Sequence, residues 1–309
     1  MLLKLVPAGT KIPFMSGRFA AFVASAIAVL ASVVLFFAVG LNFGIDFRGG
    51  TLIEIQTTDG PADISEIRSI VGGLDLGDVQ IQEFGTPQDV LIRIEEQPGG
   101  ELAQQQVIVK VREALGEETV DYRRVEIVGP QVSSELARDG TIAVIIAIMA
   151  ILIYIWFRFE WQYALGAVIA LVHDVLLTIG LFSIVGYEFN LSSIAAVLTI
   201  VGYSLNDTVV IYDRVRENLR KFKKMPIGDL LNLSINDTLS RTLMTSVTTL
   251  IALTALFVFG GEVIRSFTFA MIWGVIIGTY STVFVAAPVL MFLKLRPQTD
   301  SGDAEPAKA

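Results

Sequence analysis

The stretch Gly202–Asn218, GYSLNDTVVIYDRVREN, decides the fold of this chain. It begins as an apolar helical segment typical of a membrane span, carries Asn206 and Asp207 inside that segment, and becomes charged from Asp213 onwards. Inserting a carboxylate into the centre of a bilayer costs about 2.5–3.5 kcal/mol. A protein keeps such a group where it is paired, faces a protein or water cavity, or titrates. Asp207 is therefore expected to have a partner elsewhere in the chain.

The composition indicates a polytopic α-helical membrane protein. The 309-residue chain is 53% hydrophobic, and several of its apolar runs have the roughly 20 residues that cross a hydrocarbon core of about 30 Å. The chain has no cysteine, which excludes disulfides and thiolate metal sites. Its single histidine, His173, excludes a multi-histidine metal centre. We therefore expect no metal and no cofactor.

Six spans are expected from the apolar runs: Phe19–Val39, Ile142–Phe157, Trp161–Val185, Leu191–Tyr212, Leu239–Phe259 and Phe267–Leu293. They divide the chain into an N-terminal segment 1–18, a first span 19–40, an outer domain 41–138, a bundle 139–294 with an amphipathic segment at 213–237, and a tail 295–309. The first run is too long for the apolar core of a signal peptide, which has about 7–15 residues. We interpret it as an uncleaved span.

The distribution of Lys and Arg predicts the orientation. With six spans, the basic N-terminus, Arg158, the cluster between Arg214 and Lys224, and Lys294 with Arg296 all fall on one side. Positive charge collects on the cytoplasmic side of a membrane protein. Both termini are therefore expected in the cytoplasm, and the acidic domain 41–138 in the periplasm.

In the outer domain, segments with the apolar pattern of strands alternate with segments that have the apolar pattern of helices. Strands are expected at 51–57, 79–83, 90–94 and 120–128, and helices at 62–71 and 101–115, separated by Gly- and Pro-rich turns. The order βαββαβ is that of the small α+β ferredoxin-like fold. This fold hosts many functions and by itself indicates none.

Asp207 needs a partner, and Arg241 is the candidate. Asp207 is in the cytoplasmic half of the fourth span, and Arg241 is near the cytoplasmic start of the fifth, so the two are expected at similar depth. A bidentate carboxylate–guanidinium pair has the geometry that offsets the burial of both charges. Two interpretations stay open. The pair is either a static salt bridge between helices or a titrating pair in which protonation of Asp207 releases Arg241.

Further polar residues lie in the predicted spans. Asp174 is expected to cap a buried polar network, with His173 donating to a nearby carbonyl or carboxylate. Hydroxyl side chains recur at helical spacing in the fifth span at Thr242, Thr245, Ser246 and Thr249. This stripe indicates close helix packing or, alternatively, a water path beside Arg241. The GxxxG segment Gly274–Gly278 is interpreted as a packing site.

Three segments connect these parts. Asn42–Gly50 links the first span to the outer domain, with Gly44, Asp46, Gly49 and Gly50 as candidate hinge or collar residues. Glu126–Leu136 leaves the domain through Gly129 and Pro130, which have the same candidate role. Asp213–Asp237 alternates charged and apolar residues and predicts an amphipathic helix on the cytoplasmic lipid surface. A docking site for a cytoplasmic partner is the alternative.

Six motifs occur in order along the chain: GxDFxGG after the first span, VGPxVxxxL before the second, FRFEW after it, AxVHD in the third, GYSLNDTVVIYDRVREN in the fourth and SRTLMTS in the fifth. Together they resemble the SecF branch of the SecD/SecF family over nearly the whole chain from Asn42 to about Arg296.

The resemblance implies a role in bacterial protein export. A SecF-like chain supplies half of a pseudo-symmetric transporter of the resistance–nodulation–division type in the inner membrane, and SecD supplies the other half. Proton flow is expected to move the exported domains and to help draw precursor proteins from the SecYEG channel. By this resemblance Asp207 and Arg241 form the proton relay, completed by a carboxylate of SecD. Asn206, Asp174, His173 and Thr245 would support it.

The resemblance also implies a transport subunit and not an enzyme, with protons as coupling ion, no nucleic-acid partner, and further small accessory subunits as candidate partners. Two other function classes are the alternatives. A half of an efflux pump would need a larger outer domain with an aromatic pocket. An intramembrane aspartyl protease would need Asp174 and Asp207 to share a proton as a dyad.

Overall fold

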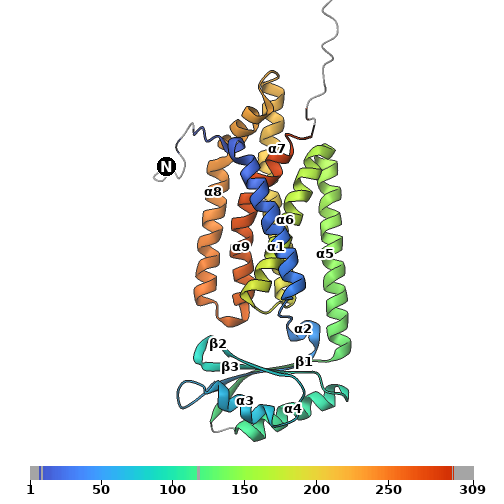
Figure 1. Cartoon of the computed structure of the whole chain (residues 1–309), viewed down its shortest axis with the longest axis vertical. Helices are drawn as coiled ribbons and strands as arrows, with labels where there is room; N and C mark the ends of the chain where they lie inside the picture. The colour runs from blue at the N-terminus through green and yellow to red at the C-terminus, as the bar shows by residue number, and fades with distance from the viewer. Residues whose placement is uncertain (1–6, 8–9, 117–118, 294, 296–309) are drawn as a thin grey trace, which may run out of the picture.

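A helical bundle carries a small sheet domain at one end (Figure 1). The computed structural model describes residues 7, 10–116, 119–293 and 295, apart from the side chain of Glu262. Most of the predicted tail 295–309 and part of the segment 1–18 lie outside the described residues. In the described chain six helical segments are long and apolar enough to cross a membrane, as predicted.

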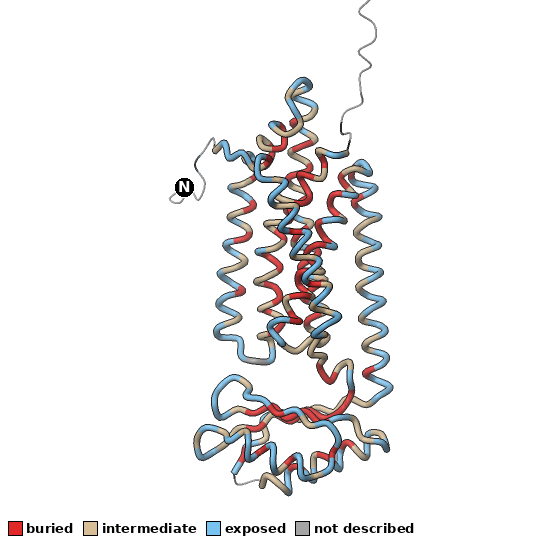
Figure 2. The backbone as a smooth tube through the Cα atoms, viewed as in Figure 1, coloured by how far each residue is buried: buried red, intermediate tan, exposed pale blue. Residues whose placement is uncertain are grey.

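The bundle has three inner and three outer helical segments. Its elements are the short helix η1 (Phe14–Gly17), α1 (Arg18–Ala38), α5 (Pro130–Arg158), α6 (Trp161–Val185), α7 (Leu191–Lys221), α8 (Ile227–Phe259), η2 (Glu262–Ile264), α9 (Arg265–Ser281), the π-helix η3 (Thr282–Ala286) and α10 (Ala287–Val289). At least half of the most apolar segment of α6, of α7 and of the α9 span is buried, against 11% for α1, α5 and α8. Figure 2 shows this central burial.

Small residues allow the inner helices to approach closely. A Cβ atom added at Gly274 of α9 would lie 2.2 Å from Cγ1 of Ile200 on α7, and one added at Gly180 of α6 would lie 2.2 Å from Oγ of Ser32 on α1. Both distances are far below van der Waals contact. The packing role predicted for the GxxxG segment is therefore confirmed, and α7 is held against α9 along its length.

One predicted boundary, the start of the helical bundle after the outer domain, lies too late in the sequence. The helix of the second span begins at Pro130 and not near residue 140, because Gly129 is extended and Pro130 suits the first helical position. Only Gly129 separates this helix from the last strand. The polar residues after Pro130 are thus helical, and the domain is joined directly to α5.

The segment 213–237 is not one helix on the lipid surface. Helix α7 continues to Lys221 and α8 begins at Ile227, which makes a helical hairpin at the end of the bundle opposite the sheet (Figure 1). Val215 and Leu230 are fully buried in this hairpin. Its apolar residues pack within the protein instead of against lipid, which explains why the amphipathic pattern misled the prediction.

The sheet domain has the predicted ferredoxin-like topology. Its elements are α2 (Ile45–Arg48), β1 (Gly50–Thr57), α3 (Ile64–Gly72), β2 (Val79–Phe84), β3 (Thr86–Ile94), α4 (Gly100–Leu115) and β4 (Val120–Val128). The strand order is β2-β3-β1-β4, and every neighbouring pair is antiparallel.

Side-chain alternation gives the sheet two different faces. Ile53, Ile55 and Ile92 are fully buried in the core shared with α3 and α4. Leu52 and Leu91 belong to the opposite face, where they pack with Ile45 of α2. In Figure 1, α3 and α4 cover the face remote from the bundle. The face with Leu52 and Leu91 is therefore turned towards the membrane-spanning helices.

Candidate functional site

Asp207 is buried inside the bundle and has an unsatisfied oxygen. Its side chain belongs to α7 and the residue is only 3% exposed. Among the described residues, Oδ2 of Asp207 has no hydrogen-bond partner. A buried acceptor without a donor costs about 1–3 kcal/mol, and more when it is charged. The position therefore carries an energetic penalty that a purely structural residue would not need.

Arg241 and Thr245 of α8 are the polar groups near Asp207. The Arg241 guanidinium acts on the carboxylate through its charge, and the Thr245 hydroxyl donates to the Thr242 carbonyl at 2.9 Å. In the described part of the chain, however, no nitrogen of Arg241 lies within 4.0 Å of an Asp207 oxygen, and Arg241 is exposed. The predicted bidentate pair is not formed, because α8 turns Arg241 towards its outer side.

Asn206 also lies on the outside of the bundle. It is exposed, as is Gly202 one turn earlier on α7. Asn206 of α7 and Arg241 of α8 are thus exposed polar side chains, and we refer to these two residues as the exposed polar face. Polar and charged side chains within membrane spans almost always face protein or a water-filled cavity.

Asp174 is the centre of a fully buried network that joins three helices. Its Oδ2 accepts hydrogen bonds from Ser204 Oγ of α7 at 2.7 Å and from Ser281 Oγ of α9 at 2.8 Å. Its Oδ1 lies 2.9 Å from Nδ1 of His173. No hydrogen bond links Asp174 to Asp207 among the described side chains. The two carboxyl groups are thus not arranged as the dyad that the protease hypothesis requires.

A π-helix lies beside this network. Thr282, the first residue of η3, has its Oγ1 atom 2.9 Å from Oγ1 of Thr208 on α7, and Ser281 directly precedes it. Single π-helical turns inside α-helices occur frequently at functional sites. Sequence reasoning missed Ser204, Ser281, Thr208 and Thr282. Their only signal was the presence of hydroxyl residues and the nearby Pro288 in apolar helices.

The first collar residues hold the domain to the start of α7. Oδ2 of Asp46 accepts a hydrogen bond from the Leu191 amide at 2.9 Å, and the Gly44 amide donates to the Phe189 carbonyl at 2.9 Å. A Cβ atom on Gly44 would collide with the side chain of Glu188. The backbone before α2 is therefore tightly fitted against the loop between α6 and α7.

Gly49 and Gly50 make a turn that other residues would strain. Both have positive φ values, 73° and 112°. A Cβ atom on Gly50 would also lie 2.4 Å from the Ile94 carbonyl oxygen. These glycines fix the entry into β1, and on the exit side Gly129 has open space around it.

An ion pair between Arg93 and Glu188 joins the two parts of the molecule, and sequence reasoning did not single it out. Nη2 of Arg93 on β3 lies 3.1 Å from Oε2 of Glu188 in the α6–α7 loop, and both side chains are largely buried. Nη1 of Arg93 also donates to Oδ1 of Asn42 at 3.2 Å. Burial raises the pKa of the Glu188 carboxyl, and the charge of Arg93 opposes this shift.

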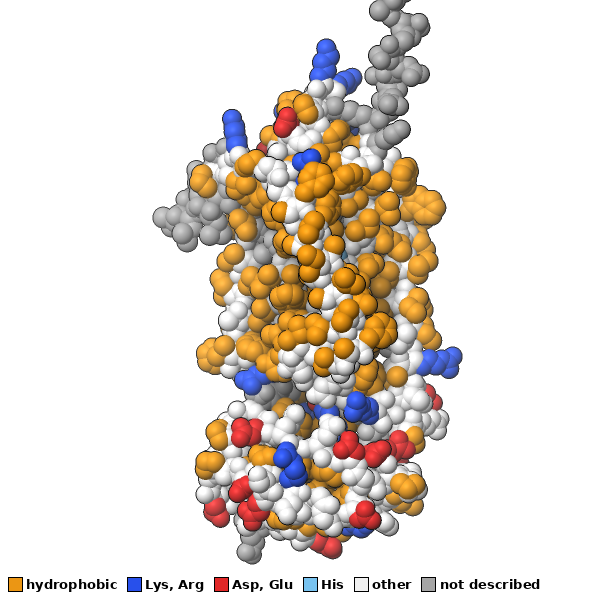
Figure 3. Space-filling model, in the orientation of Figure 1, with side chains coloured by type: hydrophobic (Ala, Val, Ile, Leu, Met, Phe, Trp, Pro, Cys, Tyr) orange, Lys and Arg blue, Asp and Glu red, His pale blue; other side chains and the backbone are white. Residues whose placement is uncertain are grey.

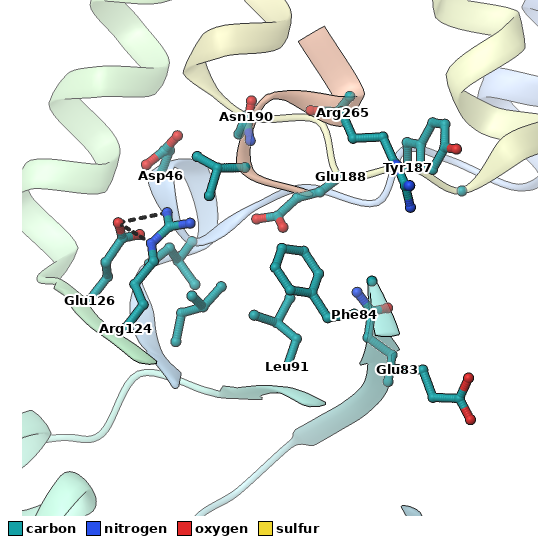
Figure 4. A pocket seen from close by; sticks show the side chains of 17 residues that line it. Asp46, Glu83, Phe84, Leu91, Arg124, Glu126, Tyr187, Glu188, Asn190 and Arg265 are labelled. Atoms are coloured by element: carbon teal, nitrogen blue, oxygen red, sulfur yellow. Dashed lines mark hydrogen bonds and ion pairs between the residues drawn. The ribbon is translucent and has the colours of Figure 1, made fainter. Parts of the chain in front are cut away.

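A cavity of about 310 Å³ separates the sheet from the bundle next to this ion pair. Leu52, Phe84 and Leu91 line it from the sheet, and Tyr187 and Arg265 line it from the bundle. Figure 4 shows Arg124 held by Glu126 on one side of the cavity and Glu188 projecting into it. The domain therefore touches the bundle at a limited set of contacts around an open space.

Comparison with known families gives two matches. Residues 107–296 match the family described as "Protein export membrane protein SecD/SecF, C-terminal". Residues 34–60 match the "SecD/SecF GG Motif", which includes Gly49 and Gly50. The first match covers more than half of the chain.

Individual proteins named as SecF or SecDF are similar to this chain over most of its length. The protein translocase subunit SecF of Rhodobacter capsulatus is 47% identical over 97% of this chain and 94% of that protein, and SecF of Magnetococcus marinus is 51% identical over 92% of each. The protein translocase subunit SecDF of Brucella abortus is 47% identical, but the chain spans only 40% of its length.

Solved structures show the same architecture. The crystal structure of SecDF from Thermus thermophilus matches 93% of this chain with a TM-score of 0.83 and 32% identity, and the chain covers 39% of it. A second SecDF structure, described as a super-membrane-facing form, matches 94% of the chain with a TM-score of 0.69 and 31% identity. This chain therefore belongs to the SecD/SecF family of protein-export membrane proteins, as a SecF-type translocase subunit.

Proposed function

We propose that this chain and a SecD partner form a proton-driven machine that assists protein export through the SecYEG channel. In this proposal the chain resides in the bacterial inner membrane, with the sheet domain in the periplasm and Asp207 and Arg241 in the proton path. Figure 3 supports the orientation: basic side chains project at the end remote from the sheet, and most of the acidic side chains in view lie over the sheet domain.

Asp207 is the observation that carries the proposal. A carboxylate buried in a membrane bundle with one oxygen lacking a donor in the described chain can take up a proton without breaking a hydrogen bond. Protonation of Asp207 removes the negative charge that attracts the nearby Arg241 guanidinium. Asp174, in contrast, has all its partners in place and serves as structural support between helices.

The exposed polar face is the surface that SecD would cover. Asn206 and Arg241 lie on the outside of α7 and α8 at membrane depth, where lipid is a poor neighbour. A carboxylate from SecD placed there would pair with Arg241 and complete the relay. The SecDF relative, in which the match to this chain occupies 40% of a longer polypeptide, supports such an association.

The start of α7 offers a route from the proton site to the outer domain. Asp207 is 16 residues after Leu191, which corresponds to about 24 Å along the helix. Leu191 is bound by Asp46 of the collar, and Glu188 just before it is bound by Arg93 of the sheet. A shift of α7 along its axis would thus act on the domain directly.

The available energy limits how this coupling can operate. One proton crossing a potential of about 100 mV releases about 2.3 kcal/mol. Converting a 1:99 equilibrium between two domain positions into 99:1 requires about 5.5 kcal/mol. The cycle therefore uses more than one proton, or the two positions are already close in free energy.

The test is Asp207→Asn in a cell whose only copy of the gene carries the change. We expect precursor proteins to accumulate in pulse-chase measurements while the variant stays in the membrane at normal abundance and in complex with SecD. Asp229→Asn, an exposed carboxylate in the first turn of α8, is the matched control and should export normally. Normal export by Asp207→Asn would show that Asp207 only helps to pack the helices.

A further inference from the structure

A basic groove lies at the end of the bundle remote from the sheet, away from the Asp207 site. Its volume is about 620 Å³, and it is lined by Arg158 from the end of α5 and by five residues of α7: Asp213, Arg216, Glu217, Arg220 and Lys221. The lining thus holds four basic and two acidic side chains. Glu217 is already engaged by Arg214, at 2.6 Å from its Nη1 atom. Asp213 is therefore the one acid of the lining left to balance four cations.

Two of the guanidinium groups that line the groove lie over one aromatic ring. Arg158 and Arg216 lie 4.7 Å and 5.4 Å from the ring centre of Phe159, which is buried. Arg158 also donates from Nη2 to both oxygens of Asp213 at 2.9 Å. Arg216 reaches the same carboxylate only at 4.0 Å. Most of the donors of Arg216 thus point to no protein acceptor within the described chain.

Arg220 follows Arg216 by one helical turn on the same side of α7. It is exposed, and among the described residues it forms no ion pair. Two adjacent guanidiniums with free donors make a surface that suits a phosphate group, because the planar fork of arginine binds phosphate oxygens in pairs. The excess positive charge of the lining attracts an anion to the groove.

The position of the groove identifies the kind of anion. Trp156 and Phe157 precede Arg158 on α5, and Trp161 begins α6; they are 69%, 90% and 58% exposed. Exposed aromatic residues mark the boundary between headgroups and hydrocarbon. A groove directly beside them lies at headgroup level. Basic pockets between helices at this level bind acidic lipid headgroups.

We propose that this groove binds the headgroup of an anionic phospholipid, with Arg216 and Arg220 donating to its phosphate and Arg158 closing one side. The acyl chains of the lipid would lie along the exposed apolar surface of α5, next to Trp156. The bound lipid would then tie the loop between α5 and α6 to the extension of α7, the helix that carries Asp207.

Tryptophan fluorescence tests the proposal, because Trp156 and Trp161 flank the groove. The full chain is reconstituted in phosphatidylcholine vesicles containing phosphatidylglycerol with brominated acyl chains, which quench nearby tryptophan. We expect preferential quenching by brominated phosphatidylglycerol over brominated phosphatidylcholine. The double variant Arg216→Gln/Arg220→Gln should lose about fivefold in relative affinity for each guanidinium removed. Trp273 on α9 provides an internal reference.

Two further variants make the result specific. Lys223→Gln/Lys224→Gln removes the same charge from the tip of the hairpin and should leave the lipid preference unchanged. Arg216→Lys/Arg220→Lys keeps the charge but loses the forked donors, and should weaken the preference partially. The site would be overturned if Lys223→Gln/Lys224→Gln lost as much of the preference for phosphatidylglycerol as Arg216→Gln/Arg220→Gln. It would also be overturned if Arg216→Lys/Arg220→Lys kept the whole preference. Either result would show that general surface charge attracts the lipid.

Competition with inorganic phosphate tests whether the groove binds a lipid headgroup or a free phosphate ion. Added phosphate should not displace brominated phosphatidylglycerol, since the lipid is retained by its acyl chains as well. Full displacement by phosphate would overturn the assignment to lipid. An unchanged lipid preference in the folded Arg216→Gln/Arg220→Gln variant would overturn the site itself.

Discussion

Arg93 and Glu188 form an ion pair with a nitrogen–oxygen distance of 3.1 Å, and it ties β3 of the sheet domain to the loop that leads into α7. Beside it, Asp46 binds the amide of Leu191, the first residue of α7. The outer domain is thus attached to the very helix that carries Asp207. An ion pair at this position can break and re-form, which suits an interface that has to transmit movement.

The two partners of this ion pair are expected to respond unequally to mutation. Arg93→Gln leaves the Glu188 carboxylate buried without its counter-charge and should weaken docking of the domain by about 1.5–3 kcal/mol. Glu188→Gln should cost less, because its amide oxygen can still accept from Arg93 and the guanidinium keeps Asn42 and Gln80 as acceptors. Hydrogen exchange of the loop 186–190 measures the difference. Equal effects would contradict this account of the burial of Glu188.

Glu188 should also make the docking of the sheet domain onto the bundle depend on pH. Burial raises the pKa of Glu188 above its usual value near 4.5, so the docked state binds a proton more readily than the undocked state. This stabilising contribution is present in full at pH values below the undocked pKa, and it is lost as the pH rises through the docked pKa. Protection of the loop from hydrogen exchange, taken relative to the intrinsic exchange rate at each pH, should therefore increase on acidification across that range. In Glu188→Gln this part of the pH dependence should disappear.

Two glycine-to-alanine substitutions in the sheet domain should have opposite effects on its free energy of unfolding. Gly50→Ala places a Cβ atom at a φ of 112° and 2.4 Å from the Ile94 carbonyl oxygen, so we expect a loss of about 1–3 kcal/mol in the free energy of unfolding. Gly72→Ala, at the end of α3 with open space around it, is the control. It should be neutral or stabilise by up to about 1 kcal/mol. Thermal unfolding of both variants checks the order.

The network around Asp174 should show cooperative losses. Ser204 and Ser281 donate to the same oxygen, Oδ2 of Asp174, so each compensates partly for the loss of the other. Each alanine variant alone should cost about 1 kcal/mol, and the double variant should cost more than the sum of the two. Thr248→Ala removes an exposed hydroxyl that donates only within its own helix, and should change the unfolding temperature little. Strict additivity would mean that the two donors act independently and that neither compensates for the loss of the other.

The sequence alone determined the features that depend on local composition. The length of the apolar runs predicts six spans, because a bilayer core has a fixed thickness. The alternation of strand and helix periods predicts the βαββαβ domain, since each element is set by its own residues. Asp207 also stood out from the sequence, because a carboxylate in a membrane span is costly wherever it lies.

Only the tertiary structure decided which distant residues meet. Arg93 and Glu188 lie far apart in the chain, and nothing local to either of them indicates the other. The hairpin made by the ends of α7 and α8 depends on Val215 and Leu230 packing within the protein, where the sequence pattern equally suited a lipid surface. Whether Arg241 reaches Asp207 depends on the rotation of α8. Such choices are fixed by packing between helices, because a hydrogen bond or ion pair forms only when both elements are placed within a few ångströms of each other.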